Sequence, residues 1–468
     1  MIHHVLILAL FQHPQAPRTA GHAAGGQERD STAGRPCKVV IDTVGHYGRQ
    51  VEVRPGETNL FAGGGVRGHC QGTASTITAD SMAWFAGVGR LDLLGGVQIR
   101  DTALSLDATT ASYFVRQERL DAHKNVVAVS HGSGSVLRGP NLVYYRAARG
   151  IRDTVEMYAA SRPTIEYRSA GDSGEPYVIV ADRVRMKGND RMWAGGQVTI
   201  DRSDFAASAD SMMRDEGAGR SVLVGKPRVQ GKGARGYTLV GRRIELGLTG
   251  REVRVIKALG AGAATTTDWR LTADTIYFQM DRRKLQRAFA WGDSSRPHAV
   301  SARHTIDADS LALDAPDEVL TEARAFGHAR STSQPDTTAA ASAERNWMTG
   351  DTITAHWVPA PPPSRSSSQG KTGTSQQLQR LVARGSARAL THMRNRHDSV
   401  TAAPSLNYSR GTIIDVTLRG DSIQQVLVTG HADGVELEPL PPAPAPGDST
   451  KHPRGKAPPS PPARRGRS

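Results

Sequence analysis

The apolar residues of this chain recur in a short phrase that appears ten times. Each copy has a small residue, two variable positions, an apolar residue, one variable position and usually a second apolar residue, as in residues 79–84 and 273–278. The small residues that open the copies are Ala79, Ala108, Gly139, Ala181, Ala209, Gly241, Ala273, Ala308, Gly350 and Gly411. Their spacing is about 30 residues, stretched by inserts in places, which is room for two strands and their turns. Such a repeat predicts stacked neighbours that share one core, with function along an extended surface.

The apolar positions alternate as in a strand, but the alternation changes phase at the small residue. Ile77 and Ala79 share one parity, whereas Met82 and Trp84 share the other. In a regular strand this slip would send half of the side chains to the wrong face. A bulge or corner at the small residue removes the conflict. We therefore predict that each long strand turns there from one wall of a sandwich to the other.

A second phrase alternates with the first, in residues 91–97, 120–126 and 192–198. It is an apolar stretch followed by Gly or Asn and a second apolar stretch, which we interpret as a turn with positive φ and a re-entry strand. Shorter copies begin at Gly327, Gly385 and Gly430. Because no segment of useful length has apolar residues at i, i+3, i+4 and i+7, the folded part is predicted to be nearly all β.

The order of the two phrases, residues 77–85 followed by 91–99, resembles the OstA-like family of lipopolysaccharide-transport proteins. Residues 61–145 match best, residues 178–198 and 271–278 fit well, and the match is degenerate from residue 350. The resemblance implies an extended, twisted, open β-jellyroll built from tandem two-strand repeats. Its sheets would enclose acyl chains, with the head groups outside, and members would stack through exposed edge strands. The long array is compatible with two fused jellyrolls or with one extended stack divided near Gly171.

Composition and the repeats together predict six segments. In chain order they are a signal segment (1–24), a first OstA-like β-jellyroll (37–170), a second OstA-like β-repeat region (177–357), a flexible Pro/Ser-rich loop (358–378), terminal degenerate β-repeats (379–440) and a disordered, basic, Pro-rich tail (441–468). The loop and the tail are of low complexity and cannot bury enough apolar surface to order themselves.

The beginning of the chain and its cysteines bear on the compartment. The apolar run of residues 5–11 is too short to span a bilayer, which takes about 20 residues. It suits the apolar part of a secretory signal, although no Lys or Arg precedes Arg18. We therefore expect export to the periplasm. There, Cys37 and Cys70 are candidates for a disulfide that would contribute about 3 kcal/mol; the alternative is two buried thiols.

The formal net charge is +14. Six basic residues lie in residues 447–468, against Asp448 as the only acid there. This tail could contact an anionic membrane surface peripherally, or it could be a non-specific solubilising arm. We predict no binding of nucleic acid, because the remaining Arg and Lys are scattered among acids without an aromatic-interleaved basic stripe.

No catalytic motif stands out. Asp follows the small residue in six copies, but Thr109, Pro140, Arg242 and Thr412 replace it in the others. A residue that varies in this way suits a polar corner that bonds local backbone better than a catalytic carboxylate pair. The histidines are dispersed, and neither a Gly-x-Ser-x-Gly elbow nor a phosphate loop is present. The chain is predicted to be non-enzymatic, with no cofactor and no metal site.

The resemblance therefore implies a protein that shields the acyl chains of a lipopolysaccharide-like glycolipid and bridges the inner and outer membranes. Its partners would be the glycolipid and other jellyroll proteins, joined by edge-strand pairing. The residues predicted to line the lipid groove are Met82, Trp84, Leu142, Tyr144, Val184, Ile276 and Phe278. For each of them the alternative is a dry core that excludes lipid. The alternative functions are a non-enzymatic envelope scaffold and a β-solenoid surface or carbohydrate-binding protein.

Overall fold

The computed structural model describes residues 36–438, with gaps at residues 170, 172–173, 189, 234, 250–251, 335–344, 360–375, 394–403 and 420–421. The predicted signal segment and tail lie outside the described residues, as does most of the predicted loop at 358–378. The ends of that loop belong to two strands, β26 (Asn346–Pro359) and β27 (Gln376–Met393).

The fold is all-β, as predicted. The described residues form thirty strands and two short 3₁₀ segments, η1 (Val115–Gln117) and η2 (Pro316–Glu318), and contain no α-helix. They divide into two compact units. The first unit runs to Ala128 and includes Pro140–Ala159; the second contains Val129–Gly139 and the residues from Ala160 onward. The division predicted near Gly171 falls inside the second unit.

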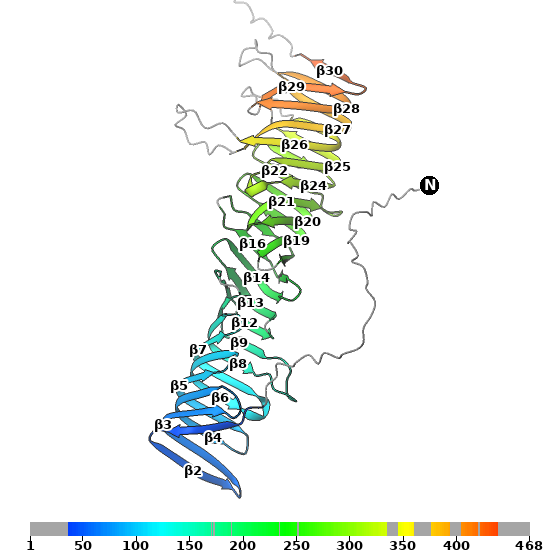
Figure 1. The fold of residues 1–468 in the computed structure, drawn as a ribbon. Coiled ribbons are helices and arrows are strands. Elements are labelled where there is room, and N and C mark those ends of the chain that lie inside the picture. The colour runs from blue at the N-terminus through cyan, green and yellow to red at the C-terminus, as the bar shows by residue number, and fades with distance from the viewer. Residues whose placement is uncertain are drawn as a thin grey trace, which may run out of the picture. The chain divides into compact units, whose positions relative to one another are not determined.

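The first unit contains the early strands, and it shares β7, β8 and β9 with the second unit. These strands are β1 (Val39–Val44), β2 (Tyr47–Arg54), β3 (Glu57–Cys70), β4 (Thr76–Phe85), β5 (Arg90–Arg100), β6 (Leu104–Phe114), β7 (Arg119–Ser130), β8 (Val136–Tyr145) and β9 (Glu156–Ala160). Within the unit, successive strands follow one another in chain order (Figure 1).

The second unit continues the same pattern. Its strands, besides β26 and β27, are β10 (Thr164–Tyr167), β11 (Tyr177–Val180), β12 (Arg183–Lys187), β13 (Arg191–Asp201), β14 (Phe205–Asp215), β15 (Arg220–Val224), β16 (Arg228–Gly231), β17 (Thr238–Val240), β18 (Arg243–Thr249), β19 (Glu252–Thr265), β20 (Trp269–Asp281), β21 (Lys284–Trp291), β22 (His298–Ser301), β23 (His304–Asp307), β24 (Ser310–Asp314), β25 (Glu322–Ser333), β28 (Ser405–Arg419), β29 (Ser422–Thr429) and β30 (Asp433–Leu437).

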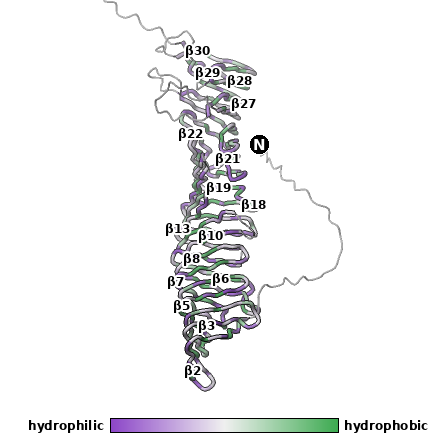
Figure 2. Tube along the Cα trace, turned by 60° about the vertical axis from the view of Figure 1, so that its left-hand side comes forward, coloured by the Kyte–Doolittle hydropathy of each residue, from purple (hydrophilic) through white to green (hydrophobic). Residues whose placement is uncertain are grey.

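The structure confirms the change of phase at the small residue. In β20, Leu271 and Ala273 are buried, and after Asp274 the burial moves to Ile276 and Phe278. The register between β19 and β20 shifts at the same place. The strand therefore bends at the small residue, and its two halves present their apolar side chains to the same interior. Hydrophobic and hydrophilic residues alternate along the strands of both units (Figure 2).

The second phrase was interpreted wrongly as a turn between two strands. Gly95 and Gly96 lie inside the continuous strand β5, and both have positive φ. Gly196 and Gln197 take the same conformation within β13. In both strands the register with the neighbour shifts at this point, because an extra residue forms a bulge. The bulge lets the strand follow the corner of its neighbour.

The two phrases meet at the same corner. A Cβ added to Gly196 would overlap the carboxyl group of Asp182, and one added to Gly385 would overlap that of Asp351. Glycine is therefore required twice, by its positive φ and by the side chain that lies against it. At one corner the carboxylate bonds the backbone of a later segment and not the local backbone that we predicted: Asp274 Oδ2 accepts the N–H groups of Ser294 and Ser295, just after β21, at 2.8 and 3.0 Å.

The corners divide each unit into two walls. In a strand with the first phrase, the half before the small residue belongs to what we call the first wall. In a strand with the second phrase, the half after the glycine belongs to the first wall. The other halves of these strands form the second wall. β13, for example, pairs with β11 through its first-wall half and with β12 through its second-wall half. In the described residues, the pairings of β11 and β12 with β13, of β19 with β20 and of β27 with β28 are antiparallel, as in a jellyroll and unlike a parallel β-helix. The walls meet at the corners and end on the opposite side in hairpin turns; we call that side the mouth.

A double-mutant cycle at one corner tests this account. Gly385→Ala should lower the free energy of unfolding by about 1–3 kcal/mol, because alanine is strained at φ +76° and its Cβ meets Asp351. Asp351→Ala alone should change it by less than about 0.5 kcal/mol, since Asp351 is exposed. The double variant should recover part of the loss in urea unfolding. Equal stability of Gly385→Ala and the unchanged protein would contradict the account.

Candidate functional site

The predicted groove residues lie in the interiors of the two units. Six of the seven are buried, namely Met82, Leu142, Tyr144, Val184, Ile276 and Phe278. Trp84, at the end of the first phrase in β4, is half-buried. The structure thus places these side chains on the inner faces of the walls, and their contact with lipid stays a prediction.

Pockets lie at the mouth, where side chains from the ends of both walls meet. One is in the first unit and at least two are in the second. Each combines an apolar lining with a few polar side chains, which is the usual composition of a small-molecule site. The sixth position of the first phrase contributes to all three, through Tyr113, Arg214 and Val416. The candidate functional site is therefore the mouth of each unit together with the apolar interior behind it.

The pocket of the first unit, which we call the Glu118 pocket, has a cavity volume of about 50 Å³. Its apolar lining consists of Ile77, Leu93, Ile99, Leu104, Leu120 and Tyr144. Asp101, Glu118 and Arg146 add charge at one end. Burial raises the pKa of Tyr144 to about 12, with a smaller contribution from Asp101. Tyrosine is neutral at neutral pH even at its ordinary pKa of about 10, so this shift leaves the charge of the pocket wall unchanged.

Glu118 is the centre of a buried network. Its side chain is fully buried. One carboxylate oxygen accepts the backbone N–H of Cys37 at 2.5 Å, and the other accepts the hydroxyl of Tyr113 at 2.6 Å. Arg146 pairs with Glu118 at 3.3 Å and with Asp101 at 3.6 Å. Burial and the Glu118 hydrogen bond raise the pKa of Tyr113. Each charged group at this mouth therefore has a partner of opposite charge within the protein, although Asp101 and Glu118 share Arg146.

The two cysteines add a covalent tie to this network. Cys37 and Cys70 are joined in a disulfide, with their Cα atoms 5.1 Å apart. Cys70 lines the Glu118 pocket at the end of β3, and Cys37 donates its N–H to Glu118. The disulfide thus anchors the segment before β1 beside the mouth.

A second pocket, which we call the Arg214 pocket, is at a mouth in the second unit. Tyr167, Tyr177 and Phe205 line it from the first wall, and Met212 and Arg214 line it from the second. The guanidinium of Arg214 lies over the Tyr167 ring, 4.8 Å from its centroid. The Tyr167 hydroxyl donates a hydrogen bond to Glu216. Burial raises the pKa of both Tyr167 and Tyr177, although Arg214 and, at Tyr177, Arg202 oppose the shift.

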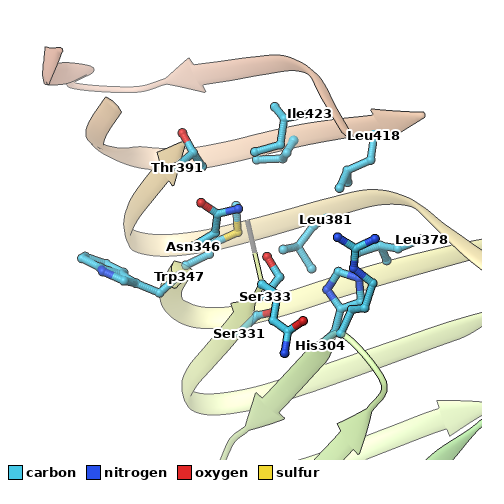
Figure 3. A pocket seen from close by; sticks show the side chains of 14 residues that line it. His304, Ser331, Ser333, Asn346, Trp347, Leu378, Leu381, Thr391, Leu418 and Ile423 are labelled. Atoms are coloured by element: carbon cyan, nitrogen blue, oxygen red, sulfur yellow. The ribbon is translucent and has the colours of Figure 1, made fainter. Parts of the chain in front are cut away.

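A third pocket lies between the strands near the end of the second unit (Figure 3). Ser331, Ser333 and Asn346 bring hydroxyl and amide groups from β25 and β26, and Leu381 and Leu418 bring apolar side chains from β27 and β28. Asn346 Oδ1 accepts the backbone N–H of His392 at 2.8 Å. One side of this pocket is therefore polar and the other apolar.

These pockets combine apolar side chains with a few charged, hydroxyl or amide groups. Within the described ranges, no group of three or more His, Cys, Asp or Glu side chains could hold a metal ion. No helix in the described part of the chain is long and apolar enough to cross a membrane. Neither a family model nor a curated protein matches this chain. The function must therefore be argued from the site itself.

The sequence did not single out Glu118, Arg146 or Arg214. Glu118 and Arg146 lie just outside the repeated phrases, so nothing in the pattern marks them. Arg214 did carry a signal, because it stands at the apolar sixth position of its copy. The disulfide candidates were named correctly. Their connection to Glu118 could not be predicted, because Cys37 and Glu118 are 81 positions apart in the sequence.

We expect Glu118→Gln to destabilise the first unit by about 3 kcal/mol, because it removes one partner of a buried ion pair. The urea midpoint should fall, and hydrogen exchange should accelerate in β4–β7. Asp107→Asn is the matched control, since it removes a half-exposed carboxylate that pairs with Arg100, and it should cost less than about 1 kcal/mol. If both variants were equally stable, the network would not hold the mouth.

Proposed function

We propose that this protein is exported to the periplasm and binds a lipopolysaccharide-like glycolipid between its walls, shielding the acyl chains on their way to the outer membrane. The observation that carries the proposal is the apolar interior that continues along each unit, with a mouth that no described strand pairing closes. The order of the two phrases, which resembles the OstA-like family, supports the same ligand class.

The physical argument concerns what must move for lipid to enter. The walls are connected by bent strands at the corners, so they can separate at the mouth without breaking a strand ladder. Buried side chains, such as Leu142 in the first unit and Ile276 in the second, would then contact acyl chains instead of their neighbours in the core. Burial of each methylene group is worth about 0.8 kcal/mol. A chain of a dozen carbons therefore gains roughly 10 kcal/mol, enough to offset the loss of several packing contacts.

Edge strands support the proposed bridge to other jellyroll proteins. Among the described residues, β1 and β2 pair only with β3, and β29 and β30 pair only with β28. These strands carry exposed apolar side chains, including Tyr47 in β2 and Val435 and Leu437 in β30. An unpaired edge with apolar side chains is a template for strand addition by a partner. The same edges would also serve an envelope scaffold that never touches lipid.

The disulfide supports an oxidising compartment, because such bonds persist in secreted and periplasmic proteins. We propose the periplasm on this basis together with the expected export signal. Peripheral contact of the basic tail with an anionic membrane surface is part of the same proposal.

Photo-crosslinking tests lipid binding. A benzophenone amino acid in place of the half-buried Trp84 should crosslink to lipopolysaccharide in intact cells. The same substitution at Tyr47, which is 61% exposed on β2, is the control and should crosslink far less. Native mass spectrometry should find glycolipid bound to the purified protein. A lipid-free protein that also fails to bind added lipopolysaccharide would exclude this function.

A charge on the edge strand tests the bridge. Val435→Lys with Leu437→Lys should weaken association through β30 by about tenfold or more, because lysine on an edge opposes strand addition. Sedimentation velocity over a range of concentrations, with and without a jellyroll partner, measures the effect. Val88→Lys, in the exposed turn between β4 and β5, should leave association unchanged. An equal effect of both variants would argue against edge pairing.

A further inference from the structure

Arg214 is a charged residue at a position that is apolar or aromatic in the other copies of the first phrase. The sixth position of the first phrase is apolar or aromatic in nine copies, as at Trp84 and Phe278, and is charged only in the copy that opens at Ala209. The side chain nevertheless points inward like the others, because Arg214 is only 9% exposed. The copy thus places a guanidinium where its neighbours place core side chains.

The structure does not compensate this charge. Within the described residues, Arg214 forms no ion pair, and its hydrogen bonds go to the hydroxyls of Ser221 and Ser169, each at 3.4 Å. Its Nε atom is buried without a partner. The carboxylate of Glu216 accepts the Tyr167 hydroxyl, and the ring of that tyrosine lies against the guanidinium. A buried charge with so few partners is costly unless something else binds it.

Two other arginines show how this chain neutralises such a group. Arg202, 8% exposed, forms two hydrogen bonds with Asp204, at 2.5 and 2.8 Å. Arg146 pairs with Glu118 and Asp101. Because Arg202 contacts Tyr177, which lines the same pocket as Arg214, a paired and an unpaired arginine lie in one neighbourhood. Of the two arginines that are buried among the described residues, Arg202 has a carboxylate partner and Arg214 has none.

The Arg214 pocket is otherwise apolar. Ile179, Ile200, Phe205, Met212 and Leu246 line it, and all five are buried. A guanidinium at the edge of an apolar lining matches a ligand with an oxyanion at the end of a hydrocarbon chain. Arginine is well suited to this, since its planar fork binds carboxylate or phosphate through two parallel hydrogen bonds.

We propose that the Arg214 pocket binds the oxyanion head group, a carboxylate or phosphate monoester, of a single-chain amphiphile. The hydrocarbon chain lies along the apolar lining, and Arg214 holds the head group at the mouth. This goes beyond the proposed function, because it requires neither a glycolipid nor transfer between membranes.

Calorimetry of the full chain with defined ligands tests the proposal. Dodecanoate and dodecyl phosphate are the anionic probes, and dodecyl maltoside, with the same chain and no charge, is the neutral comparison. We expect an anionic probe to bind at least tenfold more tightly than the maltoside. Equal affinity for all three would overturn the proposal. Binding of chainless acetate or inorganic phosphate as tight as that of the long-chain probes would identify a free-anion site and overturn it too.

Two substitutions separate binding from folding. Arg214→Met keeps the length of the side chain and removes the charge, and should weaken binding of the anionic probe at least tenfold. Its unfolding midpoint without ligand should equal or exceed that of the unchanged protein, because the uncompensated charge is gone. Arg214→Lys should retain part of the affinity. Arg228→Met, at an exposed arginine of β16, should change neither quantity.

Unchanged binding in Arg214→Met would overturn the proposal, as would a lower midpoint for this variant without ligand, which would make Arg214 a structural residue. Crosslinking of lipopolysaccharide at Trp84 should persist in Arg214→Met. The proposed glycolipid function and the Arg214 site can therefore fail separately.

Discussion

The bend at each corner is the constraint on which the rest of this structure depends. At each of these bends one of the two paired strands carries an extra residue, which lies in a pair with positive φ, as at Gly95 and Gly96 in β5 opposite β4. The neighbouring strand places a carboxyl group against the glycine, as Asp80 does. Because the same arrangement returns in each unit, neighbouring long strands bend at the same point, as β4 does with β5 and β19 with β20. Two walls with a shared interior follow from this repetition.

A corner on one side leaves a mouth on the other, and the mouth determines what the interior can do. In the first unit, Glu118, Tyr113 and Arg146 bond to one another there, and the disulfide anchors an adjacent segment. In the second unit, the Tyr167–Glu216 hydrogen bond connects residues of the two walls, and Arg214 lies beside it without a carboxylate partner. The units thus share a backbone plan and differ in the polar chemistry at the opening.

Much of the backbone arrangement could be predicted from the sequence, because it depends on a short pattern of apolar residues that repeats along the chain. The parity change between Ala79 and Met82 predicts the bend, and the burial of both side chains confirms it. The second phrase was harder, since Gly-Gly before an apolar residue fits a hairpin turn as well as a bulge. Only the neighbouring strand β4, whose Asp80 lies against Gly95, distinguishes the bulge from the hairpin turn. The network around Glu118 could not be predicted, because its members come from segments with no common pattern.

The contrast between the two arginines bears on how the walls could open. At the mouth of the first unit, Glu118 and Arg146 both lie at ends of the second wall, so opening would break their contacts with the first wall, namely the Arg146–Asp101 ion pair and the hydrogen bond from the Cys37 N–H to Glu118. At the Arg214 pocket, a ligand oxyanion would supply the partner that the guanidinium lacks, so entry forms an ion pair without breaking one. Arg214 is already largely desolvated in the folded state, at 9% exposure, and the ligand therefore meets mainly its own desolvation cost. On these grounds, the second unit is the place where an anionic amphiphile enters most easily.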